Sequence, residues 1–171
     1  MRRVLIIGSG GAGKSTLARR IGARTGLPVI HLDALYWTPG WVETPPDVWR
    51  ETVAVLLLRD AWVMDGHYGG TLDARLAAAD TVVFLDLPRA VCLGRVVRRW
   101  ARFRGTGRPS MAPGCPERLD AAFAWWVWTY PQRRRSGVLA KLAALPPATH
   151  VVVFRSSREV DRFVAALPVA A

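Results

Sequence analysis

One stretch near the start of the chain has residue types and a spacing that suit phosphate chemistry. It reads Gly-Ser-Gly-Gly-Ala-Gly-Lys-Ser over residues 8–15 and fits the pattern G-x-x-x-x-G-K-[ST] at every fixed position. Glycines let the backbone wrap a phosphate with its N–H groups pointing inward, and a following helix adds a partial positive charge. Lys14 would neutralise the β- and γ-phosphates, and the Ser15 hydroxyl would ligate Mg²⁺. The stretch therefore predicts binding of a nucleoside triphosphate.

The residues around this motif agree with a phosphate-binding loop. A β-branched apolar run over residues 3–7 predicts a buried strand before it, and the apolar spacing over residues 14–23 predicts a helix after it. The alternative is a glycine-rich turn with a chance Lys-Ser pair, and the strand–loop–helix order argues against it. The residues expected to bind the nucleotide here are Gly8, Ser9, Gly10, Gly11, Ala12, Gly13, Lys14, Ser15 and Thr16.

Short apolar strands alternate with helices along the rest of the chain. This alternation predicts an α/β fold in which helices cover both faces of a parallel sheet. The expected architecture is a three-layer P-loop NTPase with a five-stranded parallel sheet and an arginine-rich lid. The predicted strands cover residues 3–7, 29–32, 62–64, 81–85 and 150–154, and the predicted helices cover 14–23, 46–59, 71–79, a long segment from Pro88, 117–145 and 157–167, with loops at 36–46 and 105–116.

Side-chain chemistry predicts further details of these helices. Threonine and serine cap helix starts, and proline bends a helix because it lacks an N–H donor. The expected details are an inner helix face of Val48, Val55 and Leu56, caps at Thr71 and Ser157, and a bend at Pro131.

Carboxylates follow three of the predicted strands. Asp33, Asp65 and Asp86 stand where the second, third and fourth strands end. Ligands of open parallel sheets bind outside the carboxyl ends of the strands. Three aspartates there are more than solvation requires, so we expect the site at this edge.

The composition of the chain favours a globular domain and argues against a membrane-spanning protein. The chain has 171 residues, of which 51% are hydrophobic and 22% charged, which is typical of one globular domain over residues 1–171 with a lid at about 103–118. No apolar run approaches the roughly 20 residues of a membrane span, and no leader pattern is visible, so the expected compartment is the cytoplasm. Cys92 and Cys115 make a disulfide framework unexpected.

The charge is unevenly distributed. The chain holds 24 basic and 13 acidic residues, for a net charge of +11, and residues 87–135 contribute +9 of it. Such a block either meets a polyanion, such as nucleotide phosphates, nucleic acid or an anionic membrane, or forms a solvated face.

Several stretches resemble a known family. They are HLDALYW at 31–37, Trp41, WVMDGHY at 62–68, ADTVVFLDLPR at 79–89, GRP at 107–109 and GCPE at 114–117. Together with the phosphate-binding loop, these stretches resemble the adenylate-kinase-related proteins called DNA topology modulation proteins, over nearly the whole chain. The resemblance implies a P-loop kinase fold and use of ATP with Mg²⁺, and it does not name the acceptor.

The resemblance also implies roles for the strand-end residues. Asp33 matches a carboxylate that shikimate-type kinases place near Mg²⁺ and the acceptor hydroxyl, and a turn cap is its alternative. Asp65 matches an aspartate that orients Mg²⁺-bound water in adenylate kinases, and a turn-forming Asp-Gly is its alternative. Asp86 is expected to serve the start of the next helix instead. The residues expected at the acceptor are Asp33, Trp37, Asp65, Gly66, His67 and Tyr68, with Ser15 and Asp65 at the metal.

One departure from the resemblance concerns the acceptor. Adenylate kinases grip the monophosphate with an arginine where residues 67–70 here read His-Tyr-Gly-Gly. Only Arg75 could reach in instead. The departure argues against a nucleoside monophosphate acceptor. Trp37 and Trp41 are candidates for stacking on a ring, with core packing as the alternative.

The arginines divide into expected site residues and others. Arg95 and Arg99 lie four apart on one helix face and match lid arginines that contact the transferring phosphate. Arg155 is expected under the adenine. Arg102 and Arg108 are further lid candidates, Arg98 and Arg104 fit a solvated face, residues 133–135 fit either, and His31 and His150 are expected to be structural.

Three functions fit these observations. The preferred one is a kinase that transfers the γ-phosphoryl group of ATP to a small acceptor, with Lys14, Asp33, Arg95 and Arg99 as catalytic residues. The second is a nucleic-acid-associated ATP-binding protein, in which the basic segment grips the phosphate backbone. The third is an ATP sensor without turnover. Lid arginines together with strand-end aspartates favour the kinase, because the aspartates would repel DNA.

Overall fold

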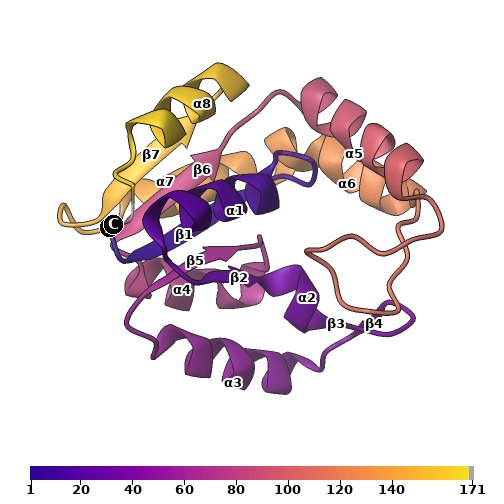
Figure 1. Ribbon diagram of the computed structural model, residues 1–171, viewed down its shortest axis with the longest axis horizontal. Coiled ribbons are helices and arrows are strands. Elements are labelled where there is room, and N and C mark those ends of the chain that lie inside the picture. The colour runs from indigo at the N-terminus through magenta and orange to yellow at the C-terminus, as the bar shows by residue number, and fades with distance from the viewer. Residues whose placement is uncertain (170–171) are drawn as a thin grey trace.

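The computed structural model describes residues 1–169 and has a five-stranded parallel sheet at its centre (Figure 1). The strand order is β2-β5-β1-β6-β7, and every neighbouring pair is parallel. The predicted sheet is therefore confirmed. Its strands are β1 (Arg3–Gly8), β2 (Val29–His31), β5 (Trp62–Asp65), β6 (Thr81–Leu85) and β7 (His150–Phe154).

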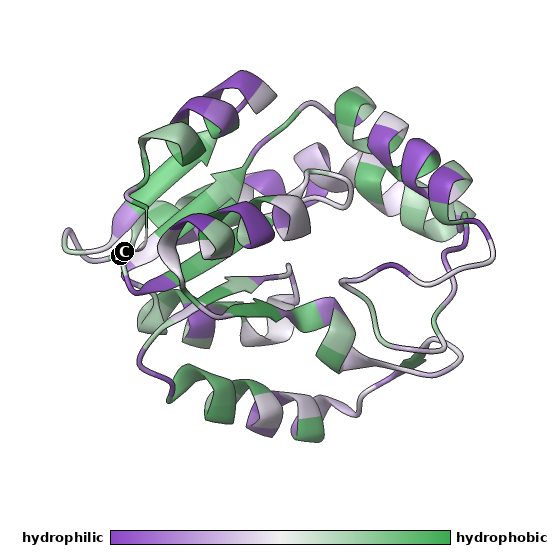
Figure 2. Ribbon diagram, in the orientation of Figure 1, coloured by the Kyte–Doolittle hydropathy of each residue, from purple (hydrophilic) through white to green (hydrophobic). Residues whose placement is uncertain are grey.

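Helices cover both faces of this sheet, as predicted. Alternate residues of one strand serve opposite faces, so Val4 and Ile6 pack under α1 and α8, whereas Leu5 and Ile7 pack under α3, α4 and α7. Figure 2 shows the central strands in green, while the helices carry both colours. The helices are α1 (Lys14–Thr25), α2 (Leu32–Tyr36), α3 (Pro46–Leu57), α4 (Leu72–Ala78), α5 (Arg89–Phe103), α6 (Ala121–Arg133), α7 (Arg135–Ala143) and α8 (Ser157–Ala166).

Among residues 1–169, no helix has both the length and the apolar character that crossing a membrane requires.

Residues 36–46 are more ordered than the predicted loop. Helix α2 ends at Tyr36, and the strands β3 (Trp37–Thr38) and β4 (Val42–Glu43) form a small antiparallel hairpin. Gly40 and Trp41, with φ of +83° and +65°, lie in its turn. Pro39 and Gly40, two of the residues that predicted a loop, lie in this turn, whereas Pro45 and Pro46 stand at the start of α3.

The buried face of α3 differs from the prediction. Leu56 is buried as predicted, but Val48 and Val55 are 46% and 64% exposed, and Trp49 and Val53 are buried in their place. Both sets fit helical spacing, and the set that contains the large indole ring lies against the sheet because it removes more apolar surface from water.

The helix predicted over 117–145 is two helices. It begins at Ala121, where the Asp120 carboxylate accepts a bond of 2.8 Å from the Ala122 N–H, and it breaks at Arg134, whose φ is −131°. Pro131 lies within α6, three residues before the break. Its missing N–H weakens the last turn, so the bend falls after the proline.

The two predicted caps are also wrong in detail. Ser156, rather than Ser157, caps α8 in a reciprocal capping box with Glu159. Thr71 stands at the start of α4 but makes no capping bond, because its hydroxyl accepts from Arg75 instead. The short 3₁₀ turn η1 (Gly69–Thr71) leads into α4.

Candidate functional site

The glycine-rich loop between β1 and α1 is packed against α5 and α6. Gly11 has a φ of +75°, and a Cβ placed on it would lie 2.2 Å from the carbonyl oxygen of Cys92. A Cβ on Gly10 would lie 2.5 Å from the ring of Phe123. The loop can approach the two helices this closely because neither residue has a side chain.

Replacing Gly11 with alanine is expected to destabilise the protein by about 2 kcal/mol or more, because the methyl group meets both backbone strain and a carbonyl. Gly94→Ala is the matched control. Gly94 lies inside α5, and a Cβ there meets no atom within 4 Å. Alanine at this position should stabilise the helix by about 0.5–1 kcal/mol. Urea unfolding of the two variants checks the contrast, and equal stabilities would contradict the described packing of the loop.

Lys14 and Ser15 begin α1 directly after this loop. The Lys14 ammonium donates to the carbonyl oxygens of Gly8 and Ser9, at 3.1 and 2.9 Å. Burial lowers the pKa of Lys14, and the nearby carboxylates of Asp33 and Asp65 act in the opposite direction. The Lys14 ammonium beside the glycine-rich loop can bind phosphate oxygens as well as these carbonyl oxygens.

Asp65 is the carboxylate closest to the start of α1. It is 4% exposed at the end of β5, and its Oδ2 accepts a hydrogen bond of 2.6 Å from the Ser15 hydroxyl. Its Oδ1 contacts Nδ1 of His31, the residue directly beside it on β2. Serine and carboxylate oxygens are suitable ligands for a hard cation such as Mg²⁺.

The Ser15 and Asp65 oxygens fit a Mg²⁺ ion whose other ligands would come from bound phosphates and water. Within residues 1–169, no cluster of three histidine, cysteine or acidic side chains has metal-binding geometry. Two protein oxygens, from Ser15 and Asp65, leave most of the coordination shell to phosphates and water, which is usual for Mg²⁺ at phosphate sites. In the same glycine-rich loop, the Ser9 hydroxyl is buried without a hydrogen-bond partner.

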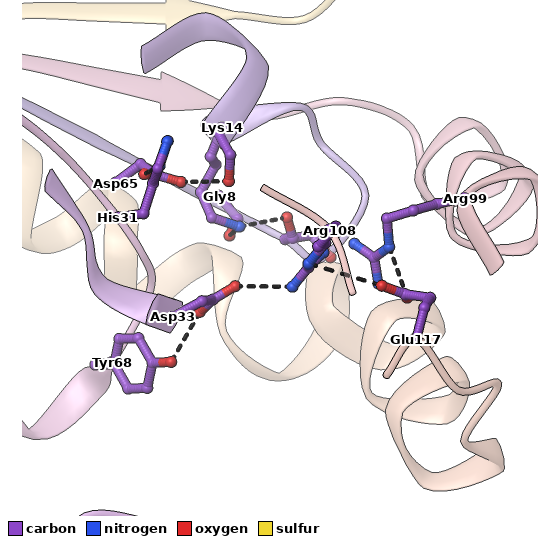
Figure 3. A network of polar contacts seen from close by, with 11 residues as sticks. Gly8, Lys14, His31, Asp33, Asp65, Tyr68, Arg99, Arg108 and Glu117 are labelled. Atoms are coloured by element: carbon purple, nitrogen blue, oxygen red, sulfur yellow. Dashed lines mark hydrogen bonds and ion pairs between the residues drawn. The ribbon is translucent and has the colours of Figure 1, made fainter. Parts of the chain in front are cut away.

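A second network joins Asp33 to the loop between α5 and α6 (Figure 3). Asp33 Oδ1 accepts from the Tyr68 hydroxyl at 2.8 Å, and Oδ2 accepts from Arg108 Nη2 at 3.1 Å. The buried Glu117 accepts from Arg99 Nε at 2.8 Å and lies 3.7 Å from Arg108 Nε. Burial and the Asp33 carboxylate raise the pKa of Tyr68, so its hydroxyl remains a donor.

The structure brings three of the four residues predicted to be catalytic, Lys14, Asp33 and Arg99, into one charged network. Asp33, Asp65 and Arg108 lie close enough to Lys14 to influence its pKa. Arg95 has other partners, since it donates to the Ala12 carbonyl oxygen at 3.1 Å and to the Ser157 hydroxyl at 2.7 Å.

The loop after α5 and the β3–β4 hairpin close the far side of this region. Trp41 Nε1 donates to the Pro116 carbonyl oxygen at 3.1 Å, and the Gly40 N–H donates to that of Gly114 at 2.9 Å. Trp37, predicted to contact the acceptor, packs against Trp41 beside Met111 and Cys115. Its indole therefore contributes to the contact between hairpin and loop.

The other arginines lie outside this network. Arg102 and Arg104 place their guanidinium groups over Phe103 and Trp100, at 5.5 and 5.4 Å from the ring centroids. Arg155 is exposed after β7, where its N–H donates to Glu159. Arg98 and Arg133 are exposed, and the guanidinium group of Arg134 lies over the Trp126 ring.

Asp86 differs from its predicted role. Its carboxylate accepts from Arg135 Nε at 2.8 and 2.9 Å and forms an ion pair with Nη2. Pro88 precedes α5 without a side-chain cap. Asp86 therefore ties β6 to α7 instead of serving the start of α5, and this contact assigns Arg135 a structural role.

Arg75 does not reach into the site. It is fully buried on α4 and donates to the carbonyl oxygens of Gly66, Tyr68 and Thr71 at 3.0, 2.6 and 3.3 Å. Its remaining close contact is the Thr71 hydroxyl at 3.2 Å. The guanidinium group holds the turn that carries His67 and Tyr68.

His67 lies between that turn and α6, against the rings of Trp126 and Tyr130. Its Nδ1 is buried without a partner. Burial, with Lys14, Arg75 and Arg134 nearby, lowers the pKa of His67 to about 3 from its ordinary 6.5. The imidazole is neutral at pH 7.

The stability of the protein should depend on pH through His67. Between pH 6.5 and 3 the unfolded chain binds a proton that the folded chain excludes, so the folded state loses up to about 1.4 kcal/mol per pH unit as pH falls. His67→Phe should remove this loss, and His150→Asn, which changes an exposed imidazole, should retain it. Urea unfolding from pH 7 to 4 measures the difference, and parallel curves for wild type and His67→Phe would count against a neutral buried His67.

Two residues of the site escaped sequence reasoning. Glu117 is one of only two acids among the eleven arginines of residues 87–135, which is the signal that marks it. His31 pairs in register with Asp65, and this contact follows from the order of β2 and β5 in the sheet. The alternation of strands and helices does not give that order.

Comparison with known proteins supports the fold. No family model matches the sequence, and no curated protein matches it. Shikimate kinase from Bacteroides thetaiotaomicron superimposes with a TM-score of 0.59 and 15% identity, over 96% of this chain and 94% of that one. Shikimate kinase from Acinetobacter baumannii, in complex with shikimate, gives 0.58 and 15%, over 96% and 89%. Deoxyadenosine kinase from M. mycoides, with dCMP and dCDP bound, gives 0.57 and 13%, over 95% and 94%.

These similarities show that the chain has the fold of the P-loop kinases. At identities of 13–15% they show the fold alone.

Proposed function

We propose that this protein is a small-molecule kinase, which transfers the γ-phosphoryl group of ATP to the hydroxyl group of a small acceptor. The observation that carries the proposal is the convergence of Lys14, the Ser15–Asp65 pair and Asp33 at one edge of the sheet. The kinase fold of the structural relatives agrees with it. We also propose that the protein is related to the DNA topology modulation proteins, as the sequence resemblance implies, and that it is cytoplasmic.

Each side chain then has a role in phosphoryl transfer. Lys14 and the glycine-rich backbone would bind the phosphates, and Arg99 and Arg108 would stabilise the charge that spreads over the transferred group. Bound Mg²⁺, held by Ser15 and Asp65, would neutralise phosphate charge. The bond between Pγ and the bridging oxygen of ADP breaks and the bond to the acceptor oxygen forms, while the acceptor proton passes to Asp33.

The loop at residues 104–120 would act as a lid. It carries Arg108, which bonds to Asp33, and it is tied to the hairpin by a backbone bond between Gly40 and Gly114 and by the Trp41 indole. A closed lid excludes water, which favours transfer to the acceptor over hydrolysis of ATP.

An ATP turnover assay with Mg²⁺ tests the proposed function. The panel contains nucleoside monophosphates, nucleosides and small hydroxylated metabolites. Lys14→Ala should abolish acceptor-dependent turnover. Lys141→Ala is the matched control, because it changes the only other lysine, which pairs with Asp73 on the surface. Equal turnover in both variants would argue against the kinase.

A nucleic-acid-associated ATP-binding protein is the second candidate. The observation in its favour is the set of arginine–aromatic pairs on α5 and α6, among them Arg104 over Trp100 and Arg89 over Trp128. Such pairs can stack on bases. This candidate predicts DNA affinity that falls steeply with salt. An ATP sensor, the third candidate, predicts nucleotide binding without turnover under any member of the panel.

A further inference from the structure

The charge of the chain changes sign on the acceptor side of the site. Residues 29–71, from β2 through the hairpin and α3 to η1, hold six acidic residues and two arginines, a net charge of −4 in a chain of +11. In Figure 1, α2, the β3–β4 hairpin and α3 lie in the lower part of the molecule, whereas α5, which carries five arginines, lies at the upper right. The two arginines of the segment, Arg50 and Arg59, are both exposed.

The first arginine after this segment in the sequence is not free to bind an anion. Arg75 is fully buried, and its guanidinium group donates to three carbonyl oxygens and one hydroxyl of residues 66–71. Turning it toward a ligand would leave those buried oxygens without donors, which is costly. Arg75 therefore contributes nothing to recognition of a phosphate or carboxylate.

The arginine that does touch the acceptor side is neutralised. Arg108 lies between Asp33 and Glu117, at 3.1 and 3.7 Å. Arg99 is likewise paired with Glu117, so Lys14, Arg99 and Arg108 face three carboxylates, those of Asp33, Asp65 and Glu117. The three positive charges are therefore neutralised by carboxylates before any ligand binds. A bound triphosphate would be the first ligand to pair with them.

An aromatic cluster begins at Tyr68, which contacts Asp33 through the carboxylate oxygen that Arg108 does not contact. Tyr36, Trp49 and Tyr68 lie within 4.5 to 5.1 Å of one another, measured between ring centroids. The Tyr68 hydroxyl donates to Asp33, and that of Tyr36 donates to Glu43 at 2.9 Å. Ring faces beside carboxylates favour hydroxyl and apolar ring groups and repel anions.

We propose, building on the kinase function above, that the acceptor is a hydroxyl compound that carries no phosphate or carboxylate group, such as an unphosphorylated nucleoside or sugar. Nucleoside monophosphates, sugar phosphates and hydroxy acids are disfavoured, because Arg75 is held by carbonyl oxygens and Arg108 by two carboxylates. The acceptor hydroxyl replaces Arg108 or Tyr68 as a hydrogen-bond donor to Asp33. The released Arg108 is then available to the triphosphate.

Matched pairs of ligands test this inference by binding. Calorimetry with Mg²⁺ and saturating ADP, which keeps the donor site filled, compares adenosine with AMP, deoxycytidine with dCMP, and glucose with glucose 6-phosphate and gluconate. An uncharged member should bind about tenfold or more tightly than its anionic partner. The preference should weaken as salt is raised, because it is electrostatic.

Tighter binding of any anionic member than of its uncharged partner would overturn the inference. Arg108→Gln then locates that affinity, since a loss of anion binding in this variant would identify Arg108 as an anion ligand. ATP consumption in the same mixtures tests phosphoryl transfer separately. If an anionic compound supports turnover, the proposed kinase function stands and the inferred charge preference is refuted. If only uncharged members bind and none supports turnover, the charge preference stands and the kinase function is refuted.

Discussion

Asp33→Asn is expected to lower acceptor-dependent turnover by about 10²- to 10⁴-fold, the usual contribution of a general base. Asparagine keeps the size of the side chain and can still accept the hydrogen bond that Tyr68 donates at 2.8 Å. It cannot take up the acceptor proton, and it loses the ion pair with Arg108. The affinity for ATP should stay within about threefold, because Asp33 lies on the acceptor side of Lys14.

Two further variants give this prediction its controls. Asp60→Asn removes an exposed carboxylate of the same acidic segment and should leave turnover unchanged. Tyr68→Phe keeps the Asp33 carboxylate and removes one hydroxyl donor, so the loss should be about tenfold. Steady-state kinetics with separate ATP and acceptor titrations distinguish the cases. If Asp33→Asn kept its kcat and lost only nucleotide affinity, Asp33 would act by holding Arg108 and not as the base.

Glu117 shows why the site could be only partly predicted from the sequence. The glycine-rich loop and Asp65 can be recognised from local patterns, because each stands at the carboxyl end of a strand in the chain. Glu117 reaches Arg99 from 18 residues away, across a loop without regular structure. Its rarity among the arginines of residues 87–135 marks Glu117 in the sequence, but its contacts depend on how the loop folds back.

The acceptor side was harder to predict for a related reason. Arg75 and the aromatic rings of α2 and α3 become neighbours of residues 66–71 only in the folded chain. The same arginine spacing fits either an anion ligand or a clamp for carbonyl oxygens, and burial decides between them. Likewise, two apolar faces of α3 satisfy the helical period, and the position of Trp49 against the sheet selects one.

The largest expected effect on stability belongs to Arg75, because its buried guanidinium group replaces a missing network of backbone bonds. Arg75→Met keeps most of the apolar stem and removes the donors to Gly66, Tyr68 and Thr71. Each buried carbonyl left without a donor costs about 1–3 kcal/mol, and relief of the buried charge offsets part of the sum. The expected net loss of unfolding free energy is about 2–4 kcal/mol.

Arg75→Lys separates the geometry of the side chain from its charge. A lysine ammonium is a point charge and cannot span three carbonyl oxygens as the planar guanidinium group does, so we expect most of the loss to remain. Arg50→Met, on the exposed face of α3, is the matched control and should change stability by less than about 0.5 kcal/mol. Urea unfolding at pH 7 measures all three variants. The Arg75 guanidinium group also holds the turn that presents Tyr68 to Asp33. Arg75→Met should therefore lose acceptor-dependent turnover at urea concentrations well below the midpoint of its unfolding. A variant as stable and as active as Arg50→Met would instead show that the turn holds itself.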